Sequence, residues 1–301
     1  METVLVVGAT GNIGVSAVKA TLRSKRRVLA IVRNQDSADK LVKHIGSSEG
    51  ITFVEANILS DSGVRGVVDQ VRAGKLPSFQ HVYSCVGGEY TTTPLKDITT
   101  SQLRHNMNAS FESNFFAYRD TIGYLLEQNY PASTWTSCTG SQGDIATHPV
   151  PAMTQGALFS MATAACRENT ATNVRFNEVY LAFRVEVDEV AAQNGTTSAS
   201  DFASVYEEIL ARPEIRSSRV RVDSRGDLKN LKTAFRRHGQ LDDLPGSNLR
   251  GWASGLYDTI WVRVMNNRAK ATFRITLILK TITWRRAEAE ATQSTPPPTP
   301  V

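Results

Sequence analysis

Short apolar runs rich in β-branched and aromatic residues recur along the first 190 residues of the chain. Such runs are typical of strands that are buried on both faces of a sheet. Six of them predict strands: "TVLVV" (3–7), "RVLAIV" (27–32), "ITFVEANI" (51–58), "FQHVYSCV" (79–86), "STWTSC" (133–138) and "NVRFNEVYLAF" (173–183).

The segments between these runs have apolar residues at helical spacing. They predict helices over residues 13–23, 36–46, 62–73, 101–127 and 152–168. Strands that alternate with helices through short turns indicate a parallel sheet, because parallel neighbours need a crossover helix. A further helix over 199–212 and a strand over 218–224 complete the pattern. The sequence therefore predicts an α/β domain over residues 1–245 with a doubly wound parallel sheet, the Rossmann fold.

The chain changes character after about residue 245. Residues 246–301 are basic, contain three of the four tryptophans and do not continue the alternation. The last residues, "STPPPTPV", have the composition of a disordered end. We expect an irregular basic extension whose segment "ATFRITLILKTITWRR" is an interfacial membrane contact, an oligomer arm or an extension without a selected function.

The formal net charge of +5 comes from this extension, because residues 1–249 sum to zero. The basic balance is therefore no argument that the main domain binds nucleic acid. No window reaches the roughly 18 consecutive apolar residues of a spanning helix. The chain begins with neither a basic leader nor a small-residue cleavage site. We expect a cytoplasmic protein that binds a small-molecule substrate, and formation of a homo-oligomer stays open.

The three cysteines give no sign of a metal site or a disulfide framework. Cys85, Cys138 and Cys166 lack metal-ligand spacing and lie inside apolar runs. This arrangement predicts buried, reduced thiols and no metal.

A glycine-rich turn follows the first predicted strand and opens the first predicted helix. In "VLVVGATGNIG", glycines permit a tight turn, a close backbone approach to a pyrophosphate and close packing of helix on strand. The free N–H groups of the helix then face the phosphates. The motif in this context predicts dinucleotide binding. We expect the cofactor to contact Gly8, Thr10, Gly11, Asn12, Ile13 and Gly14.

The end of the second predicted strand indicates which dinucleotide binds. An NAD-selective site offers a carboxylate to the ribose hydroxyls, but this strand ends in "AIVRN", with Arg33 and Asn34 in that place. A cation there favours a 2′-phosphate. The sequence therefore predicts NADP(H), although Arg33 as a solvated surface charge is the alternative.

With these motifs and this strand order, residues 3 to 225 resemble the short-chain dehydrogenase/reductase superfamily. The G-x-x-G-x-x-G spacing and "AIVRN" look like its NmrA-like branch. "FVEANILSD" resembles the segment that contacts the adenine, with Asn57 where an Asp is usual. "CVGG" resembles the segment beside the cofactor after strand four, with Gly87 kept and the usual asparagines absent.

The resemblance implies a catalytic Asn, a Ser, and a Tyr followed by a Lys four residues later, which together carry acid–base chemistry beside a hydride carrier. Within "SFESNFFAYR", Ser110 falls at the Asn position, and "TGSQG" places Ser141 at the serine. Thr154 stands where the Tyr is expected and Leu158 where the Lys is expected. None of the eight tyrosines has a lysine four residues later.

Three functions remain open on this evidence. The protein could be an NADP(H)-dependent oxidoreductase in which Ser141, a water or a substrate group completes the proton path, with help from Asp144, His148 or Tyr90. It could catalyse a non-redox cyclisation or isomerisation, or it could be a nucleotide-sensing regulator like the NmrA-type repressors. The resemblance implies a small-molecule role in secondary-metabolite biosynthesis, with Ser141 and Thr154 as the candidate catalytic residues. We expect NADP(H) binding with very poor reduction of ordinary carbonyl substrates.

The segment "LAFRVEVDEVAAQNGTTSASDF" (181–202) falls where family members carry a mobile substrate loop after the sixth strand. The usual Pro-Gly pair reads Leu181-Ala182 here. Arg184 could meet an anionic substrate group, but we favour an ion pair with Glu186 or Asp188.

Overall fold

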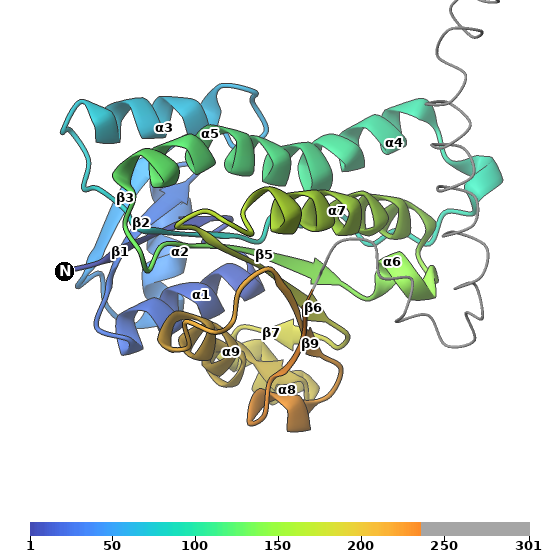
Figure 1. Ribbon diagram of the computed structural model, residues 1–301. Coiled ribbons are helices and arrows are strands. Elements are labelled where there is room, and N and C mark those ends of the chain that lie inside the picture. The colour runs from blue at the N-terminus through green and yellow to red at the C-terminus, as the bar shows by residue number, and fades with distance from the viewer. Residues whose placement is uncertain (236–301) are drawn as a thin grey trace, which may run out of the picture. The chain divides into compact units, whose positions relative to one another are not determined.

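The computed structural model describes residues 1–235, which belong to one compact unit (Figure 1). A central sheet has the strand order β10-β9-β6-β5-β4-β1-β2-β3. Its strands are β1 (Thr3–Val7), β2 (Arg27–Val32), β3 (Ile51–Glu55), β4 (His81–Ser84), β5 (Thr134–Gly140), β6 (Arg175–Leu181), β9 (Ser218–Val222) and β10 (Lys232–Phe235). All neighbours pair in parallel except β10, which runs antiparallel to β9. The predicted α/β fold with a doubly wound parallel sheet is confirmed.

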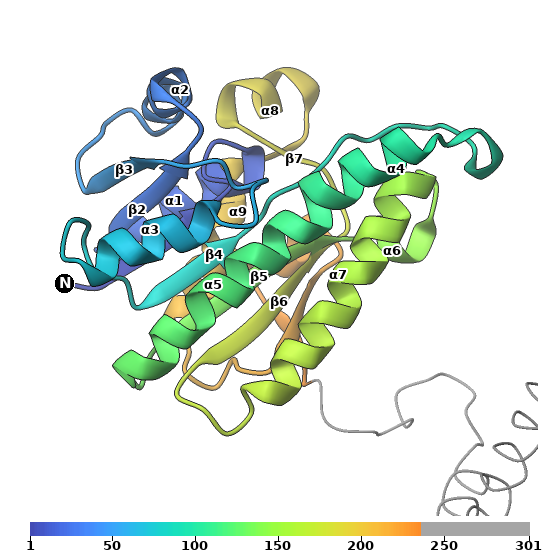
Figure 2. The ribbon, with the colours of Figure 1, turned by 90° about the horizontal axis from the view of Figure 1, so that it is seen from above.

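Helices cover both faces of the sheet (Figures 1 and 2). One face carries α1 (Asn12–Arg23), α2 (Gln35–Ile45), α8 (Asp188–Asn194) and α9 (Ala199–Ala211). The other carries α3 (Gly63–Arg72), α4 (Thr100–Asn106), α5 (Ser113–Gln128) and α7 (Pro149–Glu168), with the short α6 (Gln142–Ile145) before α7. Short helical turns, η1 (Leu95–Asp97) and η3 (Arg225–Leu228), lie in the connections.

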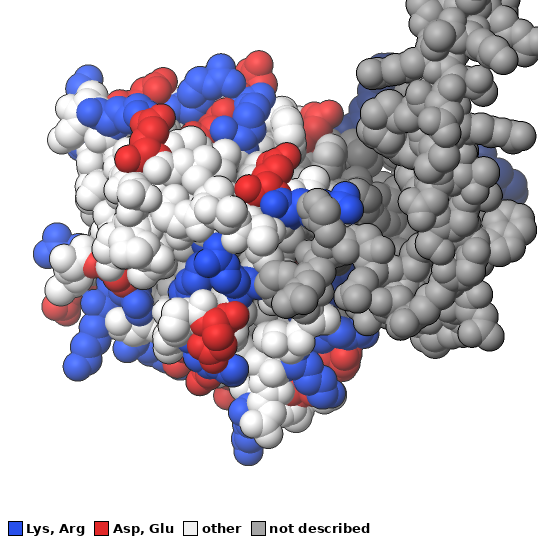
Figure 3. All heavy atoms as spheres, viewed as in Figure 1, with Lys and Arg blue, Asp and Glu red and all other residues white. Residues whose placement is uncertain are grey.

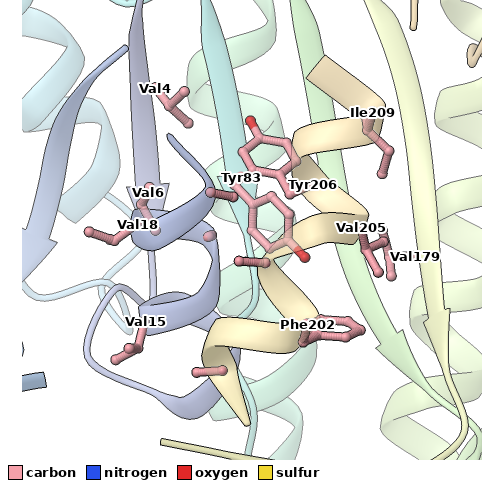
Figure 4. Close-up of a cluster of buried hydrophobic side chains, with 14 of the residues drawn as sticks. Val4, Val6, Val15, Val18, Tyr83, Val179, Phe202, Val205, Tyr206 and Ile209 are labelled. Atoms are coloured by element: carbon pink, nitrogen blue, oxygen red, sulfur yellow. The ribbon is translucent and has the colours of Figure 1, made fainter. Parts of the chain in front are cut away.

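Each helical layer encloses its own core. Under α1 and α9, the ring of Tyr83 meets that of Tyr206 edge to face, with centroids 4.5 Å apart (Figure 4). On the opposite face, Trp135 stacks on Phe176 at 5.2 Å, and its indole N–H donates to Thr121 Oγ1. The Trp135–Phe176 contact lies between the "STWTSC" and "NVRFNEVYLAF" runs, which pair as the neighbouring strands β5 and β6.

The structure differs from the sequence prediction in three places. The predicted helix over 101–127 is interrupted by a π-helical turn, η2 (Met107–Glu112), between α4 and α5. The segment expected to be a mobile loop after β6 holds α8 and a small sheet of β7 (Val185–Glu186) and β8 (Thr197–Ser198). The antiparallel strand β10 has no counterpart in the prediction. The basic extension predicted over 246–301 lies outside the described residues.

The charged surface is mixed on the face shown in Figure 3, where Lys and Arg side chains alternate with Asp and Glu. Within residues 1–235, several charged side chains form ion pairs, such as Arg72 with Glu127 at 2.6 Å and Arg212 with Glu214 at 2.8 Å. Within residues 1–235, no helix is both long and apolar enough to cross a membrane.

Candidate functional site

The glycine-rich turn joins β1 to α1 at the carboxyl edge of the sheet, beside the end of β4. Gly8 has φ +85°, and a β-carbon on it would lie 3.3 Å from the backbone carbon and oxygen of Cys85. A β-carbon on Gly14 would lie 2.1 Å from the carbonyl oxygen of Gly8, which no side chain could tolerate. Gly11 has more room, with its nearest contact at 3.6 Å. Gly8 and Gly14 are therefore the sterically required glycines of this turn.

The amino end of α1 is open to an anion. Its N-cap residue is Gly11, and no side chain caps the first turn. The carboxamide oxygen of Asn12 turns away and accepts a hydrogen bond from the N–H of Val187 at 3.2 Å. Ile13 packs against the core, and Thr10 is half-buried beside the turn. Backbone N–H groups and the helix dipole, rather than side chains, are thus what this turn presents to a phosphate.

Arg33, Asn34 and Asn57 follow the neighbouring strands β2 and β3. Arg33 is exposed, and no partner holds its guanidinium within residues 1–235. Asn34 caps α2, since its Oδ1 accepts from the N–H of Ser37 at 3.0 Å and from the Ser37 hydroxyl at 2.8 Å. Asn57 Oδ1 accepts from the N–H of Leu59 at 3.1 Å. Arg33 is the member of this group whose side chain is free to meet a ligand.

The segment after β4 is held by two buried asparagines from the facing helices. Asn114 Nδ2 donates to the Val86 carbonyl at 2.8 Å, and its Oδ1 accepts from the Ser84 hydroxyl at 2.7 Å. Asn106 Oδ1 accepts from the N–H of Glu89 at 3.2 Å. These amides fix the path of the backbone between Ser84 and Glu89.

The two glycines of this segment differ in the room around them. A β-carbon on Gly87 would meet nothing within 4 Å, whereas one on Gly88 would lie 2.2 Å from Ser110 Oγ. Ser110, expected at the family's Asn position, therefore serves close packing, and the amide that bonds to the segment belongs to Asn114. Asn114 was not among the residues expected from the sequence, and it lies on α5 directly after the π-helical turn η2.

Ser141 and Thr154 differ in exposure and in the hydrogen bonding of their hydroxyl groups. Ser141 is half-buried after β5, its N–H donates to the Leu181 carbonyl at 2.9 Å, and its hydroxyl has no hydrogen bond within the described residues. Thr154 is 1% exposed, and its hydroxyl donates to the Pro151 carbonyl at 3.0 Å. Leu158 is likewise buried. Ser141 can therefore reach a ligand, whereas Thr154, expected to be catalytic, is engaged by its own helix.

Gln155, next to Thr154, is a residue that sequence reasoning missed. Its Oε1 accepts a hydrogen bond from the N–H of Gly140 at 2.6 Å, which joins α7 to the end of β5. The side chain is 8% exposed. No family signal marks this position, and the contact depends on helix packing that the sequence alone does not show.

The three residues considered as helpers also have different surroundings. Asp144 Oδ2 accepts the Tyr180 hydroxyl proton at 2.8 Å. Burial and this carboxylate together raise the pKa of Tyr180 to about 12. His148 Nδ1 lies 3.1 Å from Thr147 Oγ1, and its ring meets that of Tyr90 edge to face at 5.7 Å.

The region after β6 is ordered by an ion pair and its neighbours. Arg184 contacts Glu186 at 2.6 Å, which confirms the favoured pairing. Glu186 also accepts from Asn194 Nδ2 at 3.0 Å and from the Thr196 hydroxyl at 2.7 Å. These bonds connect β7 to the end of α8, so the segment has its own hydrogen-bonded framework.

All three cysteines are free thiols, and burial raises the pKa of Cys138 to about 12. Within residues 1–235, no group of three or more His, Cys, Asp or Glu side chains is placed to hold a metal ion.

Comparison with known proteins identifies relatives of this arrangement. The family model described as short chain dehydrogenase matches residues 2–193. The short-chain dehydrogenase/reductase iacG of Pestalotiopsis fici is 56% identical over 236 residues, which cover 77% of this chain and 95% of that protein.

Solved structures agree at the level of the fold. A short-chain type dehydrogenase/reductase from Mycobacterium ulcerans superimposes with a TM-score of 0.64 at 17% identity, over 77% of this chain and 92% of that one. The structure of ElxO with NADP bound gives a TM-score of 0.64 at 13% identity, over 73% and 96% of the two chains. From the family match and the close relative together, the chain belongs to the short-chain dehydrogenase/reductase family.

Proposed function

We propose that this protein binds NADP(H) at the carboxyl edge of β1, β2 and β4 and acts as an oxidoreductase on a small molecule. Two features at one edge of the sheet carry the proposal. The first turn of α1, which follows the turn of Gly8 and Gly14, has no side-chain cap, and Arg33 is exposed at the end of β2. The N–H groups of α1 fit a pyrophosphate, and the guanidinium fits a 2′-phosphate. A structural neighbour, ElxO, has NADP bound, which supports the same choice of cofactor.

The bound dinucleotide supplies hydride transfer to or from a substrate carbon. The chain's own contribution is to orient the substrate through the Ser141 hydroxyl and to exclude water with the segments after β4 and β6. The Tyr and Lys of the family's acid–base step are replaced by Thr154 and Leu158, so we propose that ordinary carbonyl reduction is slow. General acid–base assistance contributes about 10²–10⁴-fold in typical enzymes.

The proposed setting is secondary-metabolite biosynthesis, which rests on the resemblance to degenerate family members of fungal natural-product pathways.

We also propose that the protein forms a homo-oligomer. Phe115 and Leu126 are 39% and 38% exposed on α5. They lie eleven residues apart and so share one helix face, which a second copy would cover.

A cofactor titration tests the proposal. Arg33→Asp should weaken NADPH binding by about 1.5–3 kcal/mol, the range for a hydrogen bond to a charged group. NADH binding should change little, because NADH lacks the 2′-phosphate. Isothermal titration of both nucleotides measures the difference, with Lys40→Asp on the exposed side of α2 as a control for the change in charge. Equal losses of binding free energy for NADPH and NADH would show that Arg33 does not bind the 2′-phosphate.

A further inference from the structure

Tyr90 reaches the candidate site from the segment after β4. The residue is 61% exposed, yet its hydroxyl points back toward the sheet. A β-carbon built on Gly140 would lie 3.7 Å from Tyr90 Oη and 3.8 Å from the carboxamide of Gln155. Gly140 directly precedes Ser141. The phenol therefore ends beside Gly140, the residue before Ser141, and close to Gln155 of α7.

The backbone that carries Tyr90 is well fixed. Asn114 binds the carbonyl of Val86, and Asn106 accepts from the N–H of Glu89, the residue before Tyr90. The aromatic ring is supported by the edge-to-face contact with His148 at an interplanar angle of 73°. A ring held at its base and along one side can present its hydroxyl in a constant direction.

Two other side chains considered for proton transfer are engaged elsewhere. The Asp144 carboxylate holds the Tyr180 hydroxyl at 2.8 Å, and the Thr154 hydroxyl is bonded to the Pro151 carbonyl. Tyr90 Oη, by contrast, has no hydrogen-bond partner in the part of the chain that the structure describes. It is the phenol whose proton is free to be given to a ligand at Gly140.

We propose that Tyr90 is the proton donor of this protein and replaces, from a different element, the tyrosine missing from α7. The proposal rests on the oxidoreductase function proposed above. In reduction of a carbonyl, the hydride from the bound nicotinamide forms the new C–H bond at the carbonyl carbon. The Tyr90 O–H bond breaks, and its proton forms the O–H bond of the alcohol. The phenolate then recovers a proton from water, which reaches the exposed ring.

The surroundings of Tyr90 also explain why such a donor would be slow. Although the ring faces solvent, its hydroxyl end is desolvated against the protein, and this burial raises the pKa of Tyr90. The phenol stays protonated at neutral pH, as a donor must, but it is a weaker acid than a tyrosine beside a lysine. Within residues 1–235, no cation is paired with it.

The matched variants are Tyr90→Phe and Tyr124→Phe. Tyr124 lies on α5, and its ring centroid is 4.6 Å from that of Phe79. The guanidinium of Arg72, from α3, lies over the same ring. NADPH binding and NADPH oxidation with a panel of ketones and quinones are measured for both variants and the unmodified protein. Tyr90→Phe should keep NADPH binding and lose turnover by about 10-fold or more, less than the usual 10²–10⁴-fold because the donor is weak. Tyr124→Phe should match the unmodified protein.

A readout without turnover accompanies the kinetics. Tyrosine labelled with ¹³C at Cζ gives a resonance that is absent in Tyr90→Phe. We expect it to titrate above the ordinary tyrosine range and to shift when a panel ketone is added to the NADP⁺ complex. Equal turnover of Tyr90→Phe and Tyr124→Phe would overturn the proposal, as would NADPH binding with no turnover of any panel member. Failure of the unmodified protein to bind NADPH would instead overturn the proposed function.

Discussion

At the scale of single residues, the turn after β1 is set by backbone shape, whereas the two α7 positions where the family's Tyr and Lys are expected are set by packing. A side chain on Gly14 would clash with the backbone, and Gly8 has φ +85°, which side chains rarely adopt. Thr154 and Leu158, where acid–base side chains are expected, are each 1% exposed and belong to the packing of α7. The side chains at these two positions are therefore part of the packed core under α7.

This packing predicts that restoring the lysine does not restore a reductase. Leu158→Lys would bury an ammonium group without a partner, so it should lower the free energy of unfolding by about 2 kcal/mol or more. Leu158→Met, which conserves volume, should cost less than about 1.5 kcal/mol. Urea denaturation of both variants measures the difference. A Leu158→Lys protein as stable as Leu158→Met would show that position 158 opens to solvent.

The site residues could be predicted from the sequence only where the chemistry is local. The turn glycines and Arg33 follow directly from the end of a strand, and the structure leaves Arg33 free to bind. Asn114 and Gln155 could not be found in this way. Their importance depends on the segments they meet, Val86 and Gly140, which lie 28 and 15 residues away in the chain.

At the scale of elements, the opposite edge of the sheet is fixed by the first residues of the chain. Glu2 precedes β1, and its carboxylate accepts from Arg26 Nε and from the Tyr130 hydroxyl. It also lies 3.3 Å from Nε2 of His81, at the start of β4. Glu2 therefore joins β1 to β4 and to the connections before β2 and β5.

These contacts predict a loss of stability in acid. The close contact with His81, followed by the hydrogen bonds with Tyr130 and Arg26, holds the pKa of Glu2 well below its ordinary value of 4.5, although burial opposes the shift. The contribution is therefore complete above about pH 4.5 and is lost as the pH falls below it. Glu2→Gln should be less stable than the unmodified protein at pH 7, and the gap should narrow toward pH 3. Thermal melts across this range measure it, and a constant gap would contradict the assignment.

Element boundaries were predictable where the hydrophobic pattern was regular. The strands β1 and β2 and the helix α9 lie where periodicity places them. The π-helical turn η2 was not predictable, because no breaker residue marks it and the helical apolar spacing continues through it. The helix α8 was missed because its seven residues, "DEVAAQN", are mostly polar and receive their order from Glu186 and Asn12.

At the scale of the whole molecule, the doubly wound topology gathers the site. Strand order reverses between β1 and β4, so the loops after these strands diverge and leave the edge where ligands bind in open α/β sheets. Gly8, Arg33, Tyr90 and Ser141 all follow strands that end at this edge (Figure 2). The fold therefore gathers at one edge the residues that we propose bind the dinucleotide and the substrate.

The measurement that tests this account most directly is NADPH consumption by the unmodified protein with a panel of ketones and quinones, alongside NADPH binding. The account predicts that NADPH stabilises the protein while turnover stays about 10²-fold or more below the enzyme median of about 10 s⁻¹, because a weak donor replaces the Tyr and Lys pair. Substrate-dependent oxidation with kcat near 10 s⁻¹ would contradict it, and would show that the acid–base chemistry of this site is intact.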